Sequence, residues 1–381
     1  MTSQFLSRTV ILLVAVLYLN FLSRIALAPL LPVIASQFAL GHGEAGFFFL
    51  FIASGYCIGL LGSPFVSSRL NHRHIVHLSA IALGGSMLAM SRSVSVPQIY
   101  VGLFLLGFSA GFYMPSGIAI LTELVSKEHW GKGMAVHEMA PNLAFFTAPL
   151  LAEAFLGFVS WRGVIGIIGI WSILAGVLFS LLGQGGAHKG APLDPKLLRA
   201  VLTNRPFWTM AIVFALSTGA CTGVYTMLPL FLVDEIGFGR QVANTIIGYS
   251  RLSGFLALFL SGLITDRIGQ KRSMLLFATT TAILTLGLGL FHGVYLTPVL
   301  VFLQAASSEC LFPPAFAMVS SIFPSRLRGA VISMVLIVGF LFGLGVVPAA
   351  IGYLADILSF SYGFSLLGAL VLAILPALLN L

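Results

Sequence analysis

The sequence predicts an all-α integral membrane protein, with twelve transmembrane helices in two pseudo-symmetric six-helix bundles. Two observations carry this prediction. Of the 381 residues, 59% are hydrophobic and only 8% are charged, so a soluble domain of this size would lack the polar side chains to cover its surface. The apolar residues also form runs longer than about 18 residues, each of which crosses about 30 Å of hydrocarbon as a helix. A transmembrane β-barrel would instead show short alternating segments.

Charge and cysteine content exclude several other classes. The net charge of +8 comes from Lys and Arg scattered in short clusters, whereas nucleic-acid binding requires a basic stripe. Cys57, Cys221 and Cys310 lie inside apolar runs, so we interpret them as small packing residues. The histidines are dispersed, and neither a nucleophile motif nor a nucleotide-binding loop is present. We therefore expect no enzyme activity, no cofactor, no metal and no nucleic-acid partner.

The N-terminal run also imitates a cleavable secretory signal. It combines Arg8, an apolar stretch and a small-residue step at residues 26–28, which is the pattern of such signals. Pro29 follows this step at once, and the apolar pattern continues through Ile34. We therefore expect the first helix to be retained.

Apolar runs and the polar residues between them define the expected helices. The spans lie near residues 8–36, 44–69, 74–92, 97–125, 132–158, 163–184, 207–233, 241–265, 271–291, 296–322, 329–355 and 359–380. Connections are short except between Gln184 and Arg205. This stretch divides the chain into a first bundle over residues 1–184, a cytoplasmic linker over residues 185–206 and a second bundle over residues 207–381.

The distribution of Lys and Arg predicts the orientation, because positive residues favour the cytoplasmic side of a membrane. With the N-terminus inside, fourteen of the 19 Lys and Arg residues fall in cytoplasmic loops and only Arg92, Arg162 and Arg240 fall outside. We expect a multi-pass protein of the cytoplasmic membrane with both termini cytoplasmic. The remaining two arginines, Arg24 and Arg251, lie in no loop at all.

The two halves of the chain resemble each other. The segment 64–74 follows the second span, and the segment 262–272 follows the eighth. Aligning Arg69 with Arg267 also places Asn71 over Gly269, and both residue types tolerate a left-handed turn. Such repeats suit alternating access, in which two bundles rock about a site at their interface.

The segment from Gly262 to Arg272 resembles the signature loop of the major facilitator superfamily, and its N-terminal copy has Ser68 where that family usually has Asp. Residues 107–117 resemble the fourth helix of the superfamily. Ala148-Pro149, followed by Trp161-Arg162, resembles the end of its fifth. The resemblance covers essentially the whole chain. It implies the twelve-helix fold and solute transport, and it does not name a substrate.

Arg24 and Arg251 lie where an ionisable group costs about 2.5–3.5 kcal/mol to insert, so each is a candidate site residue. Arg24 is near mid-depth with Asn20 one turn earlier, and Arg251 is in the outer half of the eighth span. Anion-transporting branches of the superfamily are similar in carrying buried arginines on these helices. Since Arg presents a fork of five donors, we predict a two-sided anion site. The alternatives are ion pairs with buried glutamates or, for Arg251, snorkelling.

Three glutamates in apolar spans are candidates for proton coupling, because a buried carboxyl group exchanges protons near neutrality. Glu138 and Glu153 form a polar stripe with Asn142 on the fifth span, and Glu309 lies deep in the tenth. Alternatively, Glu138 contacts a cytoplasmic lysine and Glu309 is a counter-ion for an arginine. His137 lies about 100° from the stripe, and we interpret it as a packed, hydrogen-bonded histidine.

The remaining candidates are polar groups for the cavity and charged groups for gating. Tyr113, Tyr225, Thr222 and Gln304 are expected to offer hydrogen bonds to substrate. Asp266, Arg267 and Arg272 are expected to hold cytoplasmic helix ends together in one state, with Glu123 as a candidate partner for such arginines.

These observations favour a monomeric secondary transporter for a small organic anion, driven by or exchanged against protons. A drug or lipophilic-compound efflux antiporter is an alternative, although two buried arginines would repel a cation. A non-transporting receptor on the same fold is a further alternative, against which the lack of a sizeable soluble domain counts.

Overall fold

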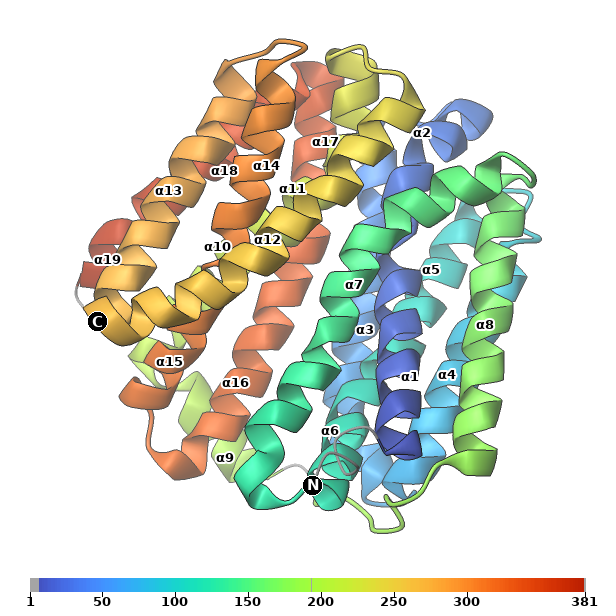
Figure 1. Ribbon diagram of the computed structural model, residues 1–381, viewed down its shortest axis with the longest axis vertical. Helices are drawn as coiled ribbons and strands as arrows, with labels where there is room; N and C mark the ends of the chain where they lie inside the picture. Colours follow the sequence, from blue (N-terminus) through green and yellow to red (C-terminus); the bar gives the residue numbers. More distant parts are fainter. Residues whose placement is uncertain (1–6, 193, 380–381) are drawn as a thin grey trace. The chain divides into compact units, whose positions relative to one another are not determined.

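The computed structural model describes residues 7–192 and 194–379, without the side chains of residues 325 and 326. Over these residues the chain forms helices joined by short connections (Figure 1), and an isolated antiparallel bridge between Asn71 and Lys189 is the only extended pairing recorded there. Residue 380, the end of the predicted twelfth span, lies outside the described residues. The chain divides into two compact units, Met1–Leu30 with Phe51–Leu193, and Leu31–Leu50 with Asp194–Leu381.

Residues 7–192 contain nine helical segments. They are α1 (Arg8–Ile25), α2 (Leu27–Phe38), α3 (His42–Ser67), α4 (His72–Met90), α5 (Val96–Gly111), α6 (Tyr113–Leu124), η1 (Lys127–His129), α7 (Trp130–Leu156) and α8 (Trp161–Leu182). The boundary between the two units falls within α2 and again within α3, so the residues from Leu31 to Leu50 belong to the second unit.

Residues 194–379 contain the remaining helical segments, including three π-helical ones, η2, η3 and η4. They are α9 (Pro195–Leu202), α10 (Arg205–Thr218), η2 (Gly219–Gly223), α11 (Val224–Leu230), η3 (Phe231–Glu235), α12 (Arg240–Ile268), α13 (Gln270–Leu290), α14 (Leu296–Glu309), α15 (Phe312–Ile322), α16 (Ser325–Gly339), η4 (Phe340–Val346), α17 (Val347–Ile357), α18 (Phe360–Ala373) and α19 (Leu375–Leu379).

Within the described ranges, eleven helical stretches are long and apolar enough to cross a membrane. The one predicted span that is not among these eleven is the third, which is α4, a helix of 19 residues and so long enough to cross a membrane. His72, Arg73, His74 and His77 stand in its first two turns and lower its hydropathy. The predicted all-helical, multi-pass membrane fold is confirmed.

Prolines interrupt several spans that the sequence presents as continuous. Proline lacks an N–H and cannot donate to the carbonyl four residues earlier. The first span breaks at Ala26, three residues before Pro29, and the fourth breaks at Phe112, three residues before Pro115. The tenth breaks after Glu309, four residues before Pro313. Backbone groups freed in this way need polar surroundings inside the protein, and candidate site residues stand beside each break.

The two halves repeat the same helix packing. In the first unit α4 packs most extensively on α8, and in the second α13 packs most extensively on α18. Both pairs join the third and sixth spans of their half. Likewise α1 packs on α7 and α10 packs on α16, which joins the first and fifth spans of each half. Gly84 and Gly169 allow close contact between α4 and α8, since a side chain on Gly84 would overlap the backbone of Gly169.

The two copies of the repeated loop have different backbones. Gly269, between α12 and α13, has a φ of 87°, which glycine adopts without strain. Asn71 occupies the aligned position before α4 with a φ of −67°, in the extended region. The left-handed turn is therefore present in the second copy and absent from the first.

Candidate functional site

Arg251 stands in a buried charged cluster within the second unit. Its guanidinium Nη1 lies 3.9 Å from Oε1 of Glu309, and its Cζ lies 4.7 Å from the ring centroid of Tyr225. Arg251 is 3% exposed and Glu309 is 8% exposed. A buried pair of opposite charges of this kind is costly to separate, and the aromatic face adds a favourable contact with the cation.

The π-helical segment η2 brings a thiol into this cluster. Sγ of Cys221 donates to Oε1 of Glu309 at 3.1 Å, and Nη1 of Arg251 lies 3.8 Å from the same sulfur. A π-helical turn widens the helix locally and is frequent at functional sites. Cys221 therefore contacts both charged residues of the cluster, a role that its position in an apolar run did not indicate.

Gln304, on α14, forms hydrogen bonds to η2 and to α13. Its Nε2 donates to the carbonyl oxygen of Ala220 at 2.7 Å and to Oγ1 of Thr285 at 3.3 Å. The side chain is completely buried, and its Oε1 has no hydrogen-bond partner among the described residues. Thr222 is also buried in η2. Four of the predicted residues, namely Arg251, Tyr225, Gln304 and Glu309, thus surround one short π-helical segment.

Arg24 lies in the first unit, at the break between α1 and α2. Its guanidinium carbon lies 4.4 Å from the ring centroid of Tyr56 and 4.5 Å from that of Phe21. Its Nε donates to the carbonyl oxygen of Asn20 at 3.4 Å, and Asn20 in turn donates to the carbonyl oxygen of Ala110 at 3.1 Å. Arg24 is thus buried against two aromatic rings. Because Arg24 and Arg251 belong to different units, a shared anion site stays a prediction.

Helix α7 holds Glu138 in a second polar cluster of the first unit. Oε1 of Glu138 lies 3.1 Å from Nδ1 of His137, and Nε2 of that imidazole lies 3.0 Å from Oη of Tyr113. Asn142 donates to the carbonyl oxygen of Glu138 at 3.0 Å and so stays on its own helix. Predicted residues Tyr113 and Glu138 are brought together here, with His137 between them.

Glu153 stands apart from this cluster. It lies fifteen residues after Glu138 on the same helix, a separation of about 22 Å along the axis. Its side chain is half-buried, near the end of α7. The three predicted carboxylates therefore have distinct surroundings, with His137 beside Glu138 and Arg251 beside Glu309.

The predicted gating residues lie at helix ends. Asp266, Arg267 and Arg272 are exposed around the turn at Gly269. Glu123, in the other unit, accepts a hydrogen bond from the backbone N–H of Gly186 at 2.7 Å and lies 3.1 Å from Nδ1 of His188. Its recorded contacts thus hold the start of the linker rather than an arginine.

A third polar cluster, in the second unit, was not predicted from the sequence. Oδ1 and Oδ2 of Asp356 accept from the backbone N–H groups of His42 and Gly43 at 2.7 and 2.8 Å. The ring nitrogens of His42 lie 3.0 Å from Asp356 and 3.2 Å from Asp234. Asp356 thereby caps the N-terminus of α3, where a negative charge is favourable.

A neighbouring carboxylate caps α18 in the same way. Oε2 of Glu235 accepts from the backbone N–H of Phe360 at 2.7 Å, and Oε1 accepts from the backbone N–H of Ser361 at 3.3 Å. The hydroxyl of Ser361 also donates to Glu235 and contacts Nε2 of His292. Charged residues at span ends are ordinary in sequence, so only the long-range contacts reveal this cluster.

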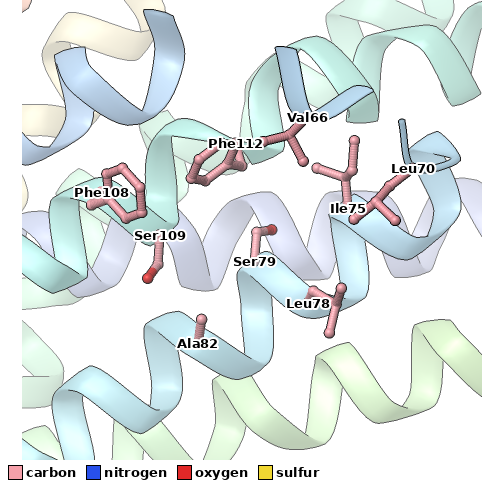
Figure 2. Close-up of a pocket in the computed structure, with 9 residues that line it drawn as sticks. All are labelled: Val66, Leu70, Ile75, Leu78, Ser79, Ala82, Phe108, Ser109 and Phe112. Carbon is pink, nitrogen blue, oxygen red and sulfur yellow. The ribbon is translucent and has the colours of Figure 1, made fainter. Parts of the chain in front are cut away.

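A separate cavity of about 160 Å³ lies among α3, α4 and the α5–α6 break (Figure 2). Its lining is apolar apart from two serines, and each hydroxyl donates to its own helix, Ser79 to Val76 and Ser109 to Leu105. This cavity contains no charged group and differs from the clusters at Arg24 and Arg251. Among the described residues, no group of three or more His, Cys, Asp or Glu is arranged to hold a metal ion.

Buried arginines, broken helices and repeated six-helix halves are the features of secondary transporters. The chain belongs to the Major Facilitator Superfamily, whose family model matches residues 13–257 and 240–380. The predicted superfamily is therefore confirmed. The protein is a multi-pass membrane protein of a transporter family and not an enzyme.

Individual relatives support the same class. The chain is 23% identical to the cis,cis-muconate transport protein of Acinetobacter baylyi (strain ATCC 33305 / BD413 / ADP1), over 91% of this chain and 87% of that protein. It is 23% identical to a probable 4-methylmuconolactone transporter of Cupriavidus pinatubonensis (strain JMP 134 / LMG 1197), over 90% and 85%. It shares its fold with a bacterial homologue of the human lysosomal transporter Spinster, at a TM-score of 0.79, 15% identity, and 100% and 96% coverage.

Proposed function

We propose that this protein is a secondary transporter that moves a small organic anion carrying a carboxylate across the cytoplasmic membrane by alternating access, together with protons. The observation that carries this proposal is the buried Arg251 beside Glu309, with its Nη1 3.9 Å from the carboxylate. This buried ion pair already holds the carboxylate of Glu309 against the guanidinium of Arg251, so a substrate carboxylate can take the same place.

The chemistry of the cluster supports an exchange of carboxylates at Arg251. The planar guanidinium presents five donors that match a carboxylate better than an ammonium would. The thiol of Cys221 contacts both charged residues, and the ring of Tyr225 lies against Arg251. An incoming substrate would displace Glu309 from Arg251 and take over its counter-charge. Glu309 is thus proposed as the group that substrate replaces.

The relatives support the substrate class. Two of them are named as transporters of muconate and of a methylmuconolactone, and a muconate is a dicarboxylate. A dicarboxylate has a second negative group that needs a second cation. Arg24 on α1, buried against Tyr56 and Phe21, is the residue that we propose for it.

Proton coupling completes the proposal. Alternating access alone equilibrates an anion, and concentrating it requires a second ion that is bound with it. We propose a proton for this role.

The proposal also covers the arrangement of the protein in the membrane. We propose a monomer as the transporting species and cytoplasmic positions for both termini. The exposed residues Asp266, Arg267 and Arg272 are proposed to hold the cytoplasmic helix ends in one state of the cycle.

Uptake into proteoliposomes tests this function. Purified protein is given a panel of labelled mono- and dicarboxylates and sulfonates, with and without a pH gradient. We expect carboxylate uptake in wild type, and an increase in KM of at least about tenfold, equivalent to about 1.4 kcal/mol, in Arg251→Gln. Arg92→Gln, a change at an exposed arginine, is the matched control. Wild-type protein that moves a lipophilic cation and no anion, or that moves no solute, would contradict the proposal.

A further inference from the structure

His137 on α7 is fully buried, and each of its ring nitrogens faces an oxygen. Nε2 lies 3.0 Å from Oη of Tyr113 on α6, and Nδ1 lies 3.1 Å from Oε1 of Glu138. The rings of His137 and Tyr113 stack at 5.9 Å between centroids, with 7° between their planes. All three side chains belong to the first unit, on helices that are labelled in Figure 1.

The hydrogen bonds of this cluster require one proton more than its neutral imidazole supplies. Oη of Tyr113 donates to the carbonyl oxygen of Leu13 at 2.7 Å, and that carbonyl can only accept. Tyr113 has used its single proton, so Nε2 of His137 must donate to Oη. A neutral imidazole carries one N–H, which leaves Nδ1 without a proton opposite the Glu138 oxygen. A carboxylate cannot donate, so this contact needs an added proton.

We infer that His137 and Glu138 form a single proton-binding site, occupied in the structure by one shared proton. The proton makes either an imidazolium with a carboxylate or a neutral imidazole with a carboxylic acid, and both arrangements satisfy the same contacts. The existence of the site rests on these hydrogen bonds alone. Its role in transport rests on the proposed function, where it is the site of the coupled proton.

Exposure and neighbouring charges define how the site exchanges its proton. His137 has no exposed side-chain surface, whereas 44% of the Glu138 side chain is exposed, so the proton enters and leaves through Glu138. Tyr113 is the group that bonds to the pair from α6. The other titratable or charged groups on the elements that pack most closely against α7 are Arg8, Tyr18 and Arg24 on α1, Glu123 on α6, Lys127, Glu128 and His129 on η1, and Arg162 on α8. Tyr56 on α3 also interacts electrostatically with Glu138.

Release of the proton to water changes the hydrogen bond between α6 and α1. His137 then keeps one N–H, which is most favourable on Nδ1 opposite the ionised Glu138. Nε2 becomes an acceptor, so the Tyr113 hydroxyl turns its proton toward it and gives up the bond to Leu13. The bond between α6 and α1 therefore exists in the protonated state and is lost in the deprotonated state. Protonation thus biases the packing of α1, the helix that carries Arg24.

Infrared pH-difference spectroscopy of the purified protein, without substrate, tests the site itself. We expect wild type to show one step in which the carboxyl band and the tyrosine C–O band change together. Glu138→Gln should show no step, because its amide donates permanently to Nδ1. Glu138→Asp, which keeps a carboxyl group at this position, should show a step again. Glu128→Gln, the same change at an exposed glutamate of η1, should retain it. A pH-dependent change in the tyrosine C–O band that persists in Glu138→Gln would overturn the inference. So would a wild-type protein in which this band does not change with pH.

Transport by the same variants tests the coupling role. Glu138→Gln should retain exchange of substrate across the membrane and lose accumulation driven by a pH gradient by at least tenfold. Accumulation that persists in Glu138→Gln while the spectroscopic step is lost would overturn the coupling role. If wild type shows the step but transports none of the carboxylates, the proposed function fails and the proton site stands.

Discussion

Gly254 lies against Glu309 so closely that a methyl group would not fit between them. A Cβ on Gly254 would lie 2.9 Å from Cγ of Glu309 and 3.2 Å from the carbonyl oxygen of Ala305. Gly254 is three residues after Arg251 on α12, which places both on one helix face. The missing side chain of Gly254 therefore provides the space through which Glu309, on α14, reaches Arg251.

We predict that Gly254→Ala strengthens substrate binding, because it displaces Glu309, the carboxylate that substrate must replace beside Arg251. The contacted atom is Cγ, near the backbone, so the side chain must shift as a whole. We expect a decrease in KM of about three- to tenfold, equivalent to about 0.6–1.4 kcal/mol, measured by uptake into proteoliposomes. Gly262→Ala on the same helix is the control, since a Cβ there meets nothing within 4 Å. Equal KM values for the two variants would contradict the prediction.

The thiol of Cys221 gives a second prediction for the same cluster. Cys221→Ala removes the donor to Glu309, whereas Cys221→Ser keeps a hydroxyl donor at this position. We expect Cys221→Ala to change the KM by about two- to tenfold, the value of one hydrogen bond of about 0.5–1.5 kcal/mol. Cys221→Ser should stay closer to wild type. If both variants behave alike, the contact between Cys221 and Glu309 does not contribute to binding.

The fold was predictable because each structural element leaves a local signal in the sequence. Long apolar runs define the spans, and the alignment of Arg69 with Arg267 reveals the two halves. The helix breaks were not predicted, although Pro29 and Pro115 mark two of them. A proline inside a span removes one hydrogen bond, and whether the helix bends or separates there depends on partners from other helices.

The buried charged residues of the candidate site could be singled out for the opposite reason, their rarity in apolar runs. Arg251 and Glu309 stand out in this way, whereas a cysteine such as Cys221 looks like any packing residue. His137 was placed off the polar stripe because adjacent helical residues point about 100° apart. The structure shows that the Glu138 side chain bends back to His137, a contact that a helical wheel does not represent.

Close contact between α3 and α5 gives a prediction about stability. A Cβ on Gly107 would overlap the carbonyl oxygen of Ile52 on α3, and backbone cannot move aside as a flexible side chain can. We expect Gly107→Ala to lower the free energy of unfolding by about 1–3 kcal/mol, the usual cost of overpacking. Thermal unfolding in detergent measures it. Gly85→Ala, where nothing lies within 4 Å, should leave Tm unchanged, and a similar loss in both variants would refute the prediction.

The cap on α3 gives a further prediction about stability. Asp356 accepts from the backbone N–H groups of His42 and Gly43, so Asp356→Ala should cost about 1–2 kcal/mol of stability, as for other lost N-caps. Asp266→Ala, at an exposed aspartate of the same unit, is the control.

The same cap should make stability depend on pH. Both ring nitrogens of His42 face carboxylate oxygens, from Asp356 and Asp234, and carboxylates only accept. The imidazole therefore contributes both contacts only when both nitrogens carry a proton. Raising the pH removes one proton and one contact, so the Tm of wild type should fall as histidine loses its charge. His42→Ala should lack this dependence, and a pH profile identical to that of wild type would show that His42 does not contribute it.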